Sequence, residues 1–65
     1  MITDKDIYTS ANLLISQHGS SAEDYANQRM QELMAKDDAK GAAVWLSIGQ
    51  AIEDLNKIKE QRYLF

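Results

Sequence analysis

The chain has 65 residues, a net charge of −3 and no cysteine. This length allows one hydrophobic core, and the missing cysteines exclude disulfides and thiolate metal sites. Apolar residues make up 45% of the sequence, but eight of them are alanines, which bury little area each. We therefore expect one helical domain over residues 1–65 with a thin core and no bound cofactor or metal. Because domains this short commonly need a partner for stability, we expect a homo-oligomer or a complex with a partner protein.

The start of the chain mixes acidic and basic residues, and the longest uninterrupted apolar run covers only residues 13–15. A secretory signal has a basic stretch followed by a longer apolar one, and a membrane span needs roughly 20 apolar residues. We expect a cytoplasmic protein that makes no contact with a membrane. The acidic balance makes nucleic acid an unfavourable partner, because phosphate contacts depend on clustered lysine and arginine. The one basic cluster, Lys57, Lys59 and Arg62, is interpreted as a solvated helix end.

The first helix is predicted over residues 4–18. The sequence has no proline, so helix is the default structure, and its ends are indicated by local signals. Thr3 and Asp6 resemble a capping box, in which each residue bonds the backbone of the other. Gly19 is the kind of residue that takes the left-handed conformation ending a helix.

The second and third helices are predicted over residues 21–35 and 38–60. Ser20 and Ser21 are each followed three residues later by an acidic residue, and these serine–acid pairs are expected to cap the start of the second helix. Asp38 is expected to cap the third helix. Short links between helices favour antiparallel neighbours. The expected fold class is all-α, a small three-helix bundle of antiparallel helices that is open to dimerisation.

Apolar residues recur every three or four positions and mark one inner face on each helix. A second small-residue stripe on the third helix includes Gly49, which costs a helix about 1 kcal/mol relative to alanine and so suggests close approach by another helix. The candidate core is Ile7, Ala11, Leu14, Ile15, Ala26, Met30, Leu33, Val44, Trp45, Ile48, Ile52 and Leu55. The candidate interface, which adds the apolar C-terminus, is Ala42, Leu46, Gly49, Leu64 and Phe65.

A resemblance covers roughly residues 4–55. The residues that carry it are Ile7-Tyr8, Ala11-Asn12-Leu13-Leu14-Ile15, His18-Gly19, Asp38-x-x-Gly41, Val44-Trp45, Ile48 and Ala51-Ile52-x-x-Leu55. This string resembles a group of very short uncharacterised proteins from alphaproteobacteria. The resemblance implies a helical protein and brings no activity, ligand or partner with it. Leu46 departs from the pattern, because a polar residue is expected beside the tryptophan.

Few residues have side chains that could act in catalysis or bind a ligand. His18 ends the first helix, where it can interact with free carbonyls, and this structural role is favoured over catalysis or ligand binding. Arg29 is expected to extend its guanidinium outward to solvent or to pair with a carboxylate near Asp38, with an anion site as the alternative. Asp37 is interpreted as solvated.

We therefore expect a non-enzymatic module for self-association or protein interaction. The alternative is a helix-turn-helix-like nucleic-acid-binding or regulatory protein, although the third helix begins with residues poorly suited to reading bases. An enzyme is disfavoured because no nucleophile, base and pocket converge in the sequence.

Overall fold

The computed structural model describes residues 2–63, with side chains as far as residue 58. The elements are α1 (Asp4–His18), the 3-10 turn η1 (Gly19–Ser21), α2 (Ala22–Ala35) and α3 (Ala39–Tyr63). The all-α prediction is confirmed for this part of the chain.

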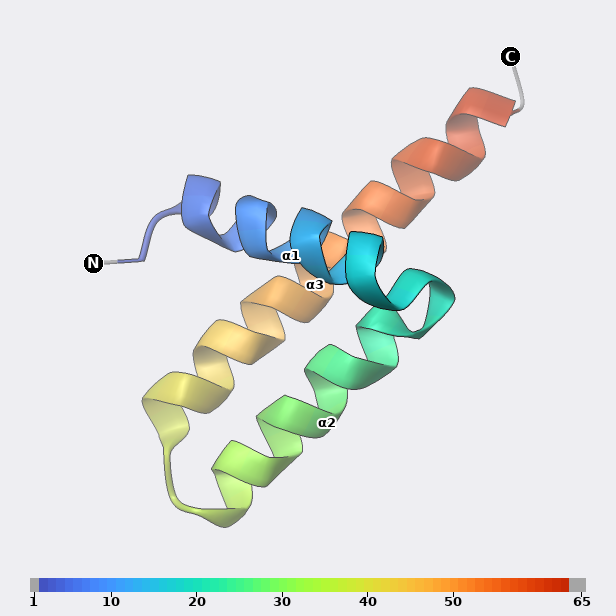
Figure 1. Cartoon of the computed structure of the whole chain (residues 1–65). Coiled ribbons are helices and arrows are strands. Elements are labelled where there is room, and N and C mark those ends of the chain that lie inside the picture. The colour runs from blue at the N-terminus through green and yellow to red at the C-terminus, as the bar shows by residue number, and fades with distance from the viewer. Residues whose placement is uncertain (1, 64–65) are drawn as a thin grey trace.

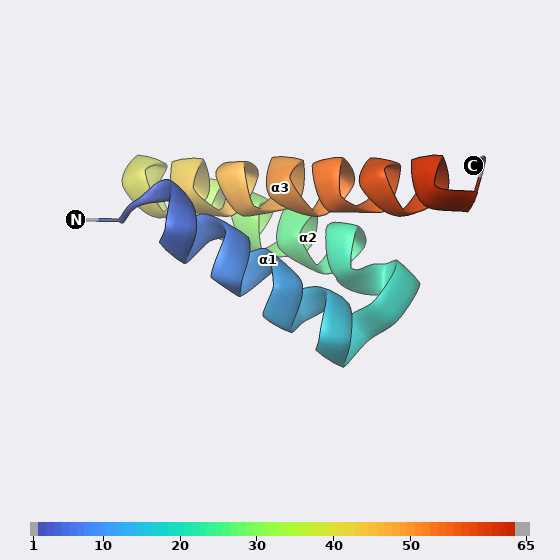
Figure 2. The same ribbon diagram turned by 90° about the horizontal axis from the view of Figure 1, so that it is seen from above.

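The two later helices form the body of the fold. α2 and α3 run antiparallel and side by side, joined by a short turn (Figure 1). α1 lies on one face of this pair and crosses it obliquely (Figure 1). In the view from above, the C-terminal end of α1 points away from α3 (Figure 2). The α2–α3 hairpin is therefore as expected, whereas α1 does not run parallel to the hairpin as a third aligned member.

Both ends of α1 are stabilised as the sequence predicts. The Thr3 hydroxyl oxygen accepts a hydrogen bond from the Asp6 backbone N–H at 3.3 Å, and the Thr3 N–H donates to the Asp6 carboxylate at 3.1 Å. At the other end, Gly19 has φ +58° and its N–H donates to the Ile15 carbonyl. These bonds satisfy backbone groups that have no partner inside the helix.

The expected serine caps of α2 are wrong. Gly19–Ser21 form the 3-10 turn η1, and Ser21 at the N-cap makes no side-chain hydrogen bond to the helix. The tighter turn redirects the chain from α1 into α2 within three residues, and α2 begins at Ala22. The acidic residues Glu23 and Asp24 still lie in its first turn, where they complement the helix dipole.

The turn between α2 and α3 combines two capping motifs. The Asp38 N–H donates to the Leu33 carbonyl at 2.9 Å and the Asp37 N–H to the Met34 carbonyl at 3.1 Å, the pattern of a Schellman motif. The Asp38 carboxylate accepts from the Gly41 N–H at 3.0 Å, so its predicted capping role is confirmed. Asp37 has φ +61°, and it therefore occupies the left-handed position that glycine usually fills.

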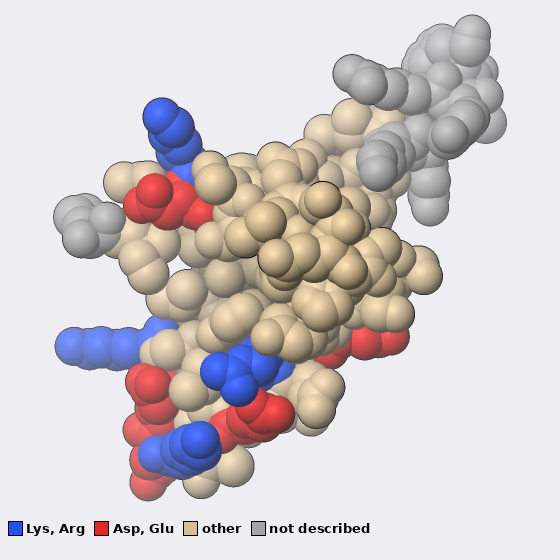
Figure 3. Space-filling view, in the orientation of Figure 1, with Lys and Arg blue, Asp and Glu red and all other residues tan. Residues whose placement is uncertain are grey.

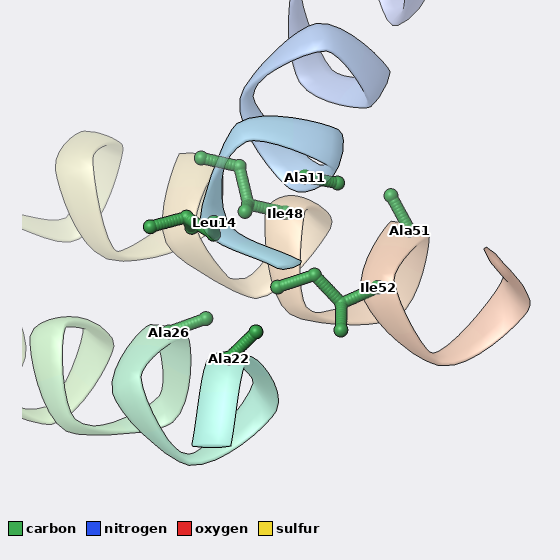
Figure 4. Packing of buried hydrophobic residues seen from close by; sticks show 7 residues of the cluster. All are labelled: Ala11, Leu14, Ala22, Ala26, Ile48, Ala51 and Ile52. Carbon is green, nitrogen blue, oxygen red and sulfur yellow. The ribbon is translucent and has the colours of Figure 1, made fainter. Parts of the chain in front are cut away.

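The core lies where α1 crosses the hairpin (Figure 4). Its buried residues are Ala11, Leu14, Ala22, Ala26, Ile48, Ala51 and Ile52. Four of these seven are alanines, so only three large side chains are buried in the cluster.

Most of the candidate core belongs to this region. Ala11, Leu14, Ala26, Ile48 and Ile52 are buried, and Ile7, Ile15, Val44, Trp45 and Leu55 are partly buried around them. Met30 and Leu33 are half-buried outside the cluster. Trp45 therefore lies at the edge of the core, because the small residues inside leave no space for its ring.

Gly49 lies in the contact between α3 and α2. A Cβ built on it would be 3.8 Å from the Ala26 Cβ and 3.8 Å from the Asn27 side-chain oxygen. Gly49 is buried, and Ala42 is only 6% exposed. The expectation that these two residues form an outward interface is wrong, because the helix that approaches Gly49 is α2 of the same chain.

Substitutions at Gly49 test this close contact. Gly49→Ala should raise the free energy of unfolding by roughly 1 kcal/mol through better helix propensity, because the added methyl meets its neighbours at ordinary van der Waals distance. Gly49→Leu should lower it by about 1 to 3 kcal/mol, because a larger side chain forces α2 and α3 apart. Urea unfolding of both variants measures the difference. A leucine variant as stable as the alanine variant would show that α2 does not pack there.

Asp37→Gly should stabilise the α2–α3 turn by about 0.5 to 1 kcal/mol, because glycine adopts a positive φ without steric cost. The neighbouring Lys36 has φ −95°, so Lys36→Gly is a matched control that should lower stability. Thermal unfolding followed by circular dichroism compares the two. Equal effects would contradict the left-handed conformation of Asp37.

Candidate interaction surface

A cleft of about 410 Å³, open to solvent, separates the start of α1 from the middle of α3. The cleft exists because α1 crosses α3 obliquely. The two helices therefore leave a wedge-shaped space between the first residues of α1 and the facing side of α3. The residues that line it are Ile2, Thr3, Asp4, Ile7, Tyr8, Ala43, Val44, Ser47, Gln50, Ala51 and Asp54.

The cleft has an apolar base and an acidic edge. Ala51 is buried and Val44 is half-buried, while Asp4 and Asp54 are exposed. Among the described residues that line the cleft, none is basic. The Tyr8 hydroxyl donates to the Asp54 carboxylate at 3.5 Å, a long hydrogen bond that joins α1 to α3. Such a surface suits an apolar group accompanied by positive charge.

A second feature is a row of rings near the end of α1. The His18 ring stacks on Tyr25 with centroids 4.4 Å apart and planes at 16°. Tyr25 in turn meets Trp45 edge-on, with centroids 5.9 Å apart and planes at 69°. The row links α1, α2 and α3, and aromatic pairs in these geometries are favourable beyond the area they bury. His18 therefore packs on a ring of α2, a contact that differs from the predicted interaction with free carbonyls at the helix end.

Arg29 lies beside this row and has two partners. Its guanidinium is 2.6 Å from the Glu32 carboxylate and 5.8 Å from the centroid of the Trp45 ring. Arg29 therefore pairs with a carboxylate, as one of the two structural options predicts, but the partner is Glu32, three residues further along the same helix, and not a residue near Asp38. With a carboxylate and an aromatic face already in contact, Arg29 mainly supports the packing of α2 on α3.

The C-terminal part of α3 extends beyond the other helices (Figures 1 and 2). With 25 residues against 14 in α2, α3 is longer by roughly 16 Å. Leu55 is half-buried and Ile58 is 52% exposed. Lys57 pairs with Glu53 at 3.2 Å on the solvent side.

The remaining candidate interface residues divide into two groups. Leu46 is 46% exposed and is available for contact. Leu64 and Phe65 lie outside the described residues.

Within the described part of the chain, no three histidine or acidic side chains are grouped as metal ligands would be, and no helix combines the length and apolar character of a membrane span. Comparisons with protein-family models, curated proteins and solved structures give no match to this chain. The resemblance to short alphaproteobacterial proteins therefore stays a prediction.

A double-mutant cycle tests the aromatic row. Replacing Tyr25 and Trp45 by alanine, singly and together, should reveal a coupling of about 0.5 to 1.5 kcal/mol in the free energy of unfolding, because their rings are in contact. His18 and Trp45 touch different sides of Tyr25, so His18→Ala combined with Trp45→Ala should be close to additive. A His18–Trp45 coupling as large as the Tyr25–Trp45 coupling would contradict the arrangement.

Proposed function

We propose that this chain is a non-enzymatic protein-interaction module that self-associates as a homodimer. The observation that carries the proposal is the small core: in the part of the chain with described side chains, the large buried hydrophobic residues are Leu14, Ile48 and Ile52. Such a core is marginal against the conformational entropy that folding removes. A second copy would supply the missing apolar contacts and complete a more stable helical bundle.

The character of the surface also favours a protein partner. The large exposed apolar residues are Ile2, Tyr8, Leu13, Met34, Leu46 and Ile58. No charged residue occurs in positions 7–22, and Figure 3 shows a broad uncharged surface in the middle of the molecule, with charged side chains toward the α2–α3 turn and the start of α1. Interface centres are depleted of charge in this way. A cysteine-free chain also suits the reducing cytoplasm, which we propose as its location.

The helix-turn-helix alternative has less support. That motif sets two helices at a steep angle of about 90 to 120° so that one of them enters the major groove. α2 and α3 instead run antiparallel side by side (Figure 1). The first turn of α3 contains Ala39, Gly41 and Ala42, with Lys40 as its one long side chain, where side chains would read bases.

Light scattering at two protein concentrations tests the proposal. The mass should be close to twice 7.3 kDa at high concentration and should fall toward the monomer on roughly hundredfold dilution. A monomeric mass at every concentration would contradict self-association.

A further inference from the structure

We propose that the cleft between α1 and α3 binds the projecting C-terminal part of α3 from a second copy of this chain. This inference rests on the proposed self-association and specifies which surfaces meet. The cleft and the projecting segment lie on different parts of one molecule, so each copy can offer both.

The cleft provides the receiving surface. Its base is apolar through Ile7, Val44 and Ala51, and its edge carries the carboxylates of Asp4 and Asp54 without any basic lining residue. Asp54 is exposed, and its contact with the Tyr8 hydroxyl is long at 3.5 Å. This carboxylate can therefore accept a closer, charged donor, which makes a shorter and stronger hydrogen bond.

The projecting part of α3 provides the complementary surface. Ile58 is 52% exposed although it continues the apolar face of Ala51 and Leu55, and residues 58, 55 and 51 share one side of a helix by their spacing. Beside it, Lys57 has an exposed ammonium group whose pairing with Glu53 is a surface contact, and such contacts are easily exchanged.

The distribution of charge along the sequence favours this pairing. The first 54 residues contain nine acidic and four basic residues, whereas the last eleven contain three basic residues and one acidic residue. Two copies therefore attract each other when the end of one α3 meets the body of the other. If each copy inserts its segment into the other, the contact is made twice about a twofold axis and closes as a dimer.

Charge reversal on both surfaces tests the pairing. Asp54→Lys should weaken self-association of the full chain about tenfold or more, because it places a lysine against Lys57 of the incoming segment. Lys57→Glu should weaken it similarly, because it places a glutamate against Asp4 and Asp54. An equimolar mixture of the two variants should associate nearly as well as the wild type, because in the mixed dimer both contacts regain opposite charges. Sedimentation at low salt gives the dissociation constants, and circular dichroism shows that the helices are retained.

Asp24→Lys is the matched control. It changes the net charge by the same amount at an exposed position on α2, and Asp24 does not line the cleft, so association should stay within about threefold of the wild type. If the wild type dimerises and Asp54→Lys matches Asp24→Lys, or if the mixture fails to associate, the cleft contact is wrong while the proposed self-association stands. If the wild type is monomeric, the self-association proposal fails, and this inference fails with it.

Discussion

The close contact between α2 and α3 is the constraint on which the rest of the structure depends. It is made by small residues: Gly49 has no side chain, and the nearest atom to its missing Cβ is the methyl group of Ala26. Helices that meet through such residues approach closely but bury little apolar area each. The larger rings of Tyr25 and Trp45 are therefore left at the edge of the contact, where they stack with their neighbours instead of filling the centre.

The thin core and the exposed apolar surface follow from the same arrangement. α1 crosses the α2–α3 pair instead of lying along it, so its contact with the pair is centred on Ala11 and Leu14, with Ile7 and Ile15 partly buried beside them. The crossing leaves the cleft on one side, and α3 continues beyond the covered region on the other. The two features proposed to mediate binding, the cleft between α1 and α3 and the projecting end of α3, thus both result from the oblique course of α1.

Local signals predicted the elements well, and the tertiary arrangement could not be predicted from them. The cap at Thr3, the end at Gly19 and the cap at Asp38 each depend on residues within a few positions, so the sequence contains the whole interaction. Gly49 lies in a helix contact, but a Cβ there would meet Ala26 and Asn27 at an ordinary 3.8 Å, so the contact does not require glycine. Only the fold determines that the neighbouring helix is α2. Asp37 carries no sequence signal for a positive φ as clear as that of glycine.

The contacts between helices also could not be predicted from the sequence. The stacking of His18 on Tyr25 and the oblique course of α1 depend on how η1 redirects the chain, which the periodicity of apolar residues does not encode.

If the small core makes folding depend on association, the melting temperature itself must depend on concentration, since only the folded dimer gains from a second copy. Calorimetry over a roughly hundredfold concentration range should show the melting temperature rising by several degrees from the most dilute to the most concentrated sample. A melting temperature that stays constant over this range would show that one chain is sufficient for its own stability.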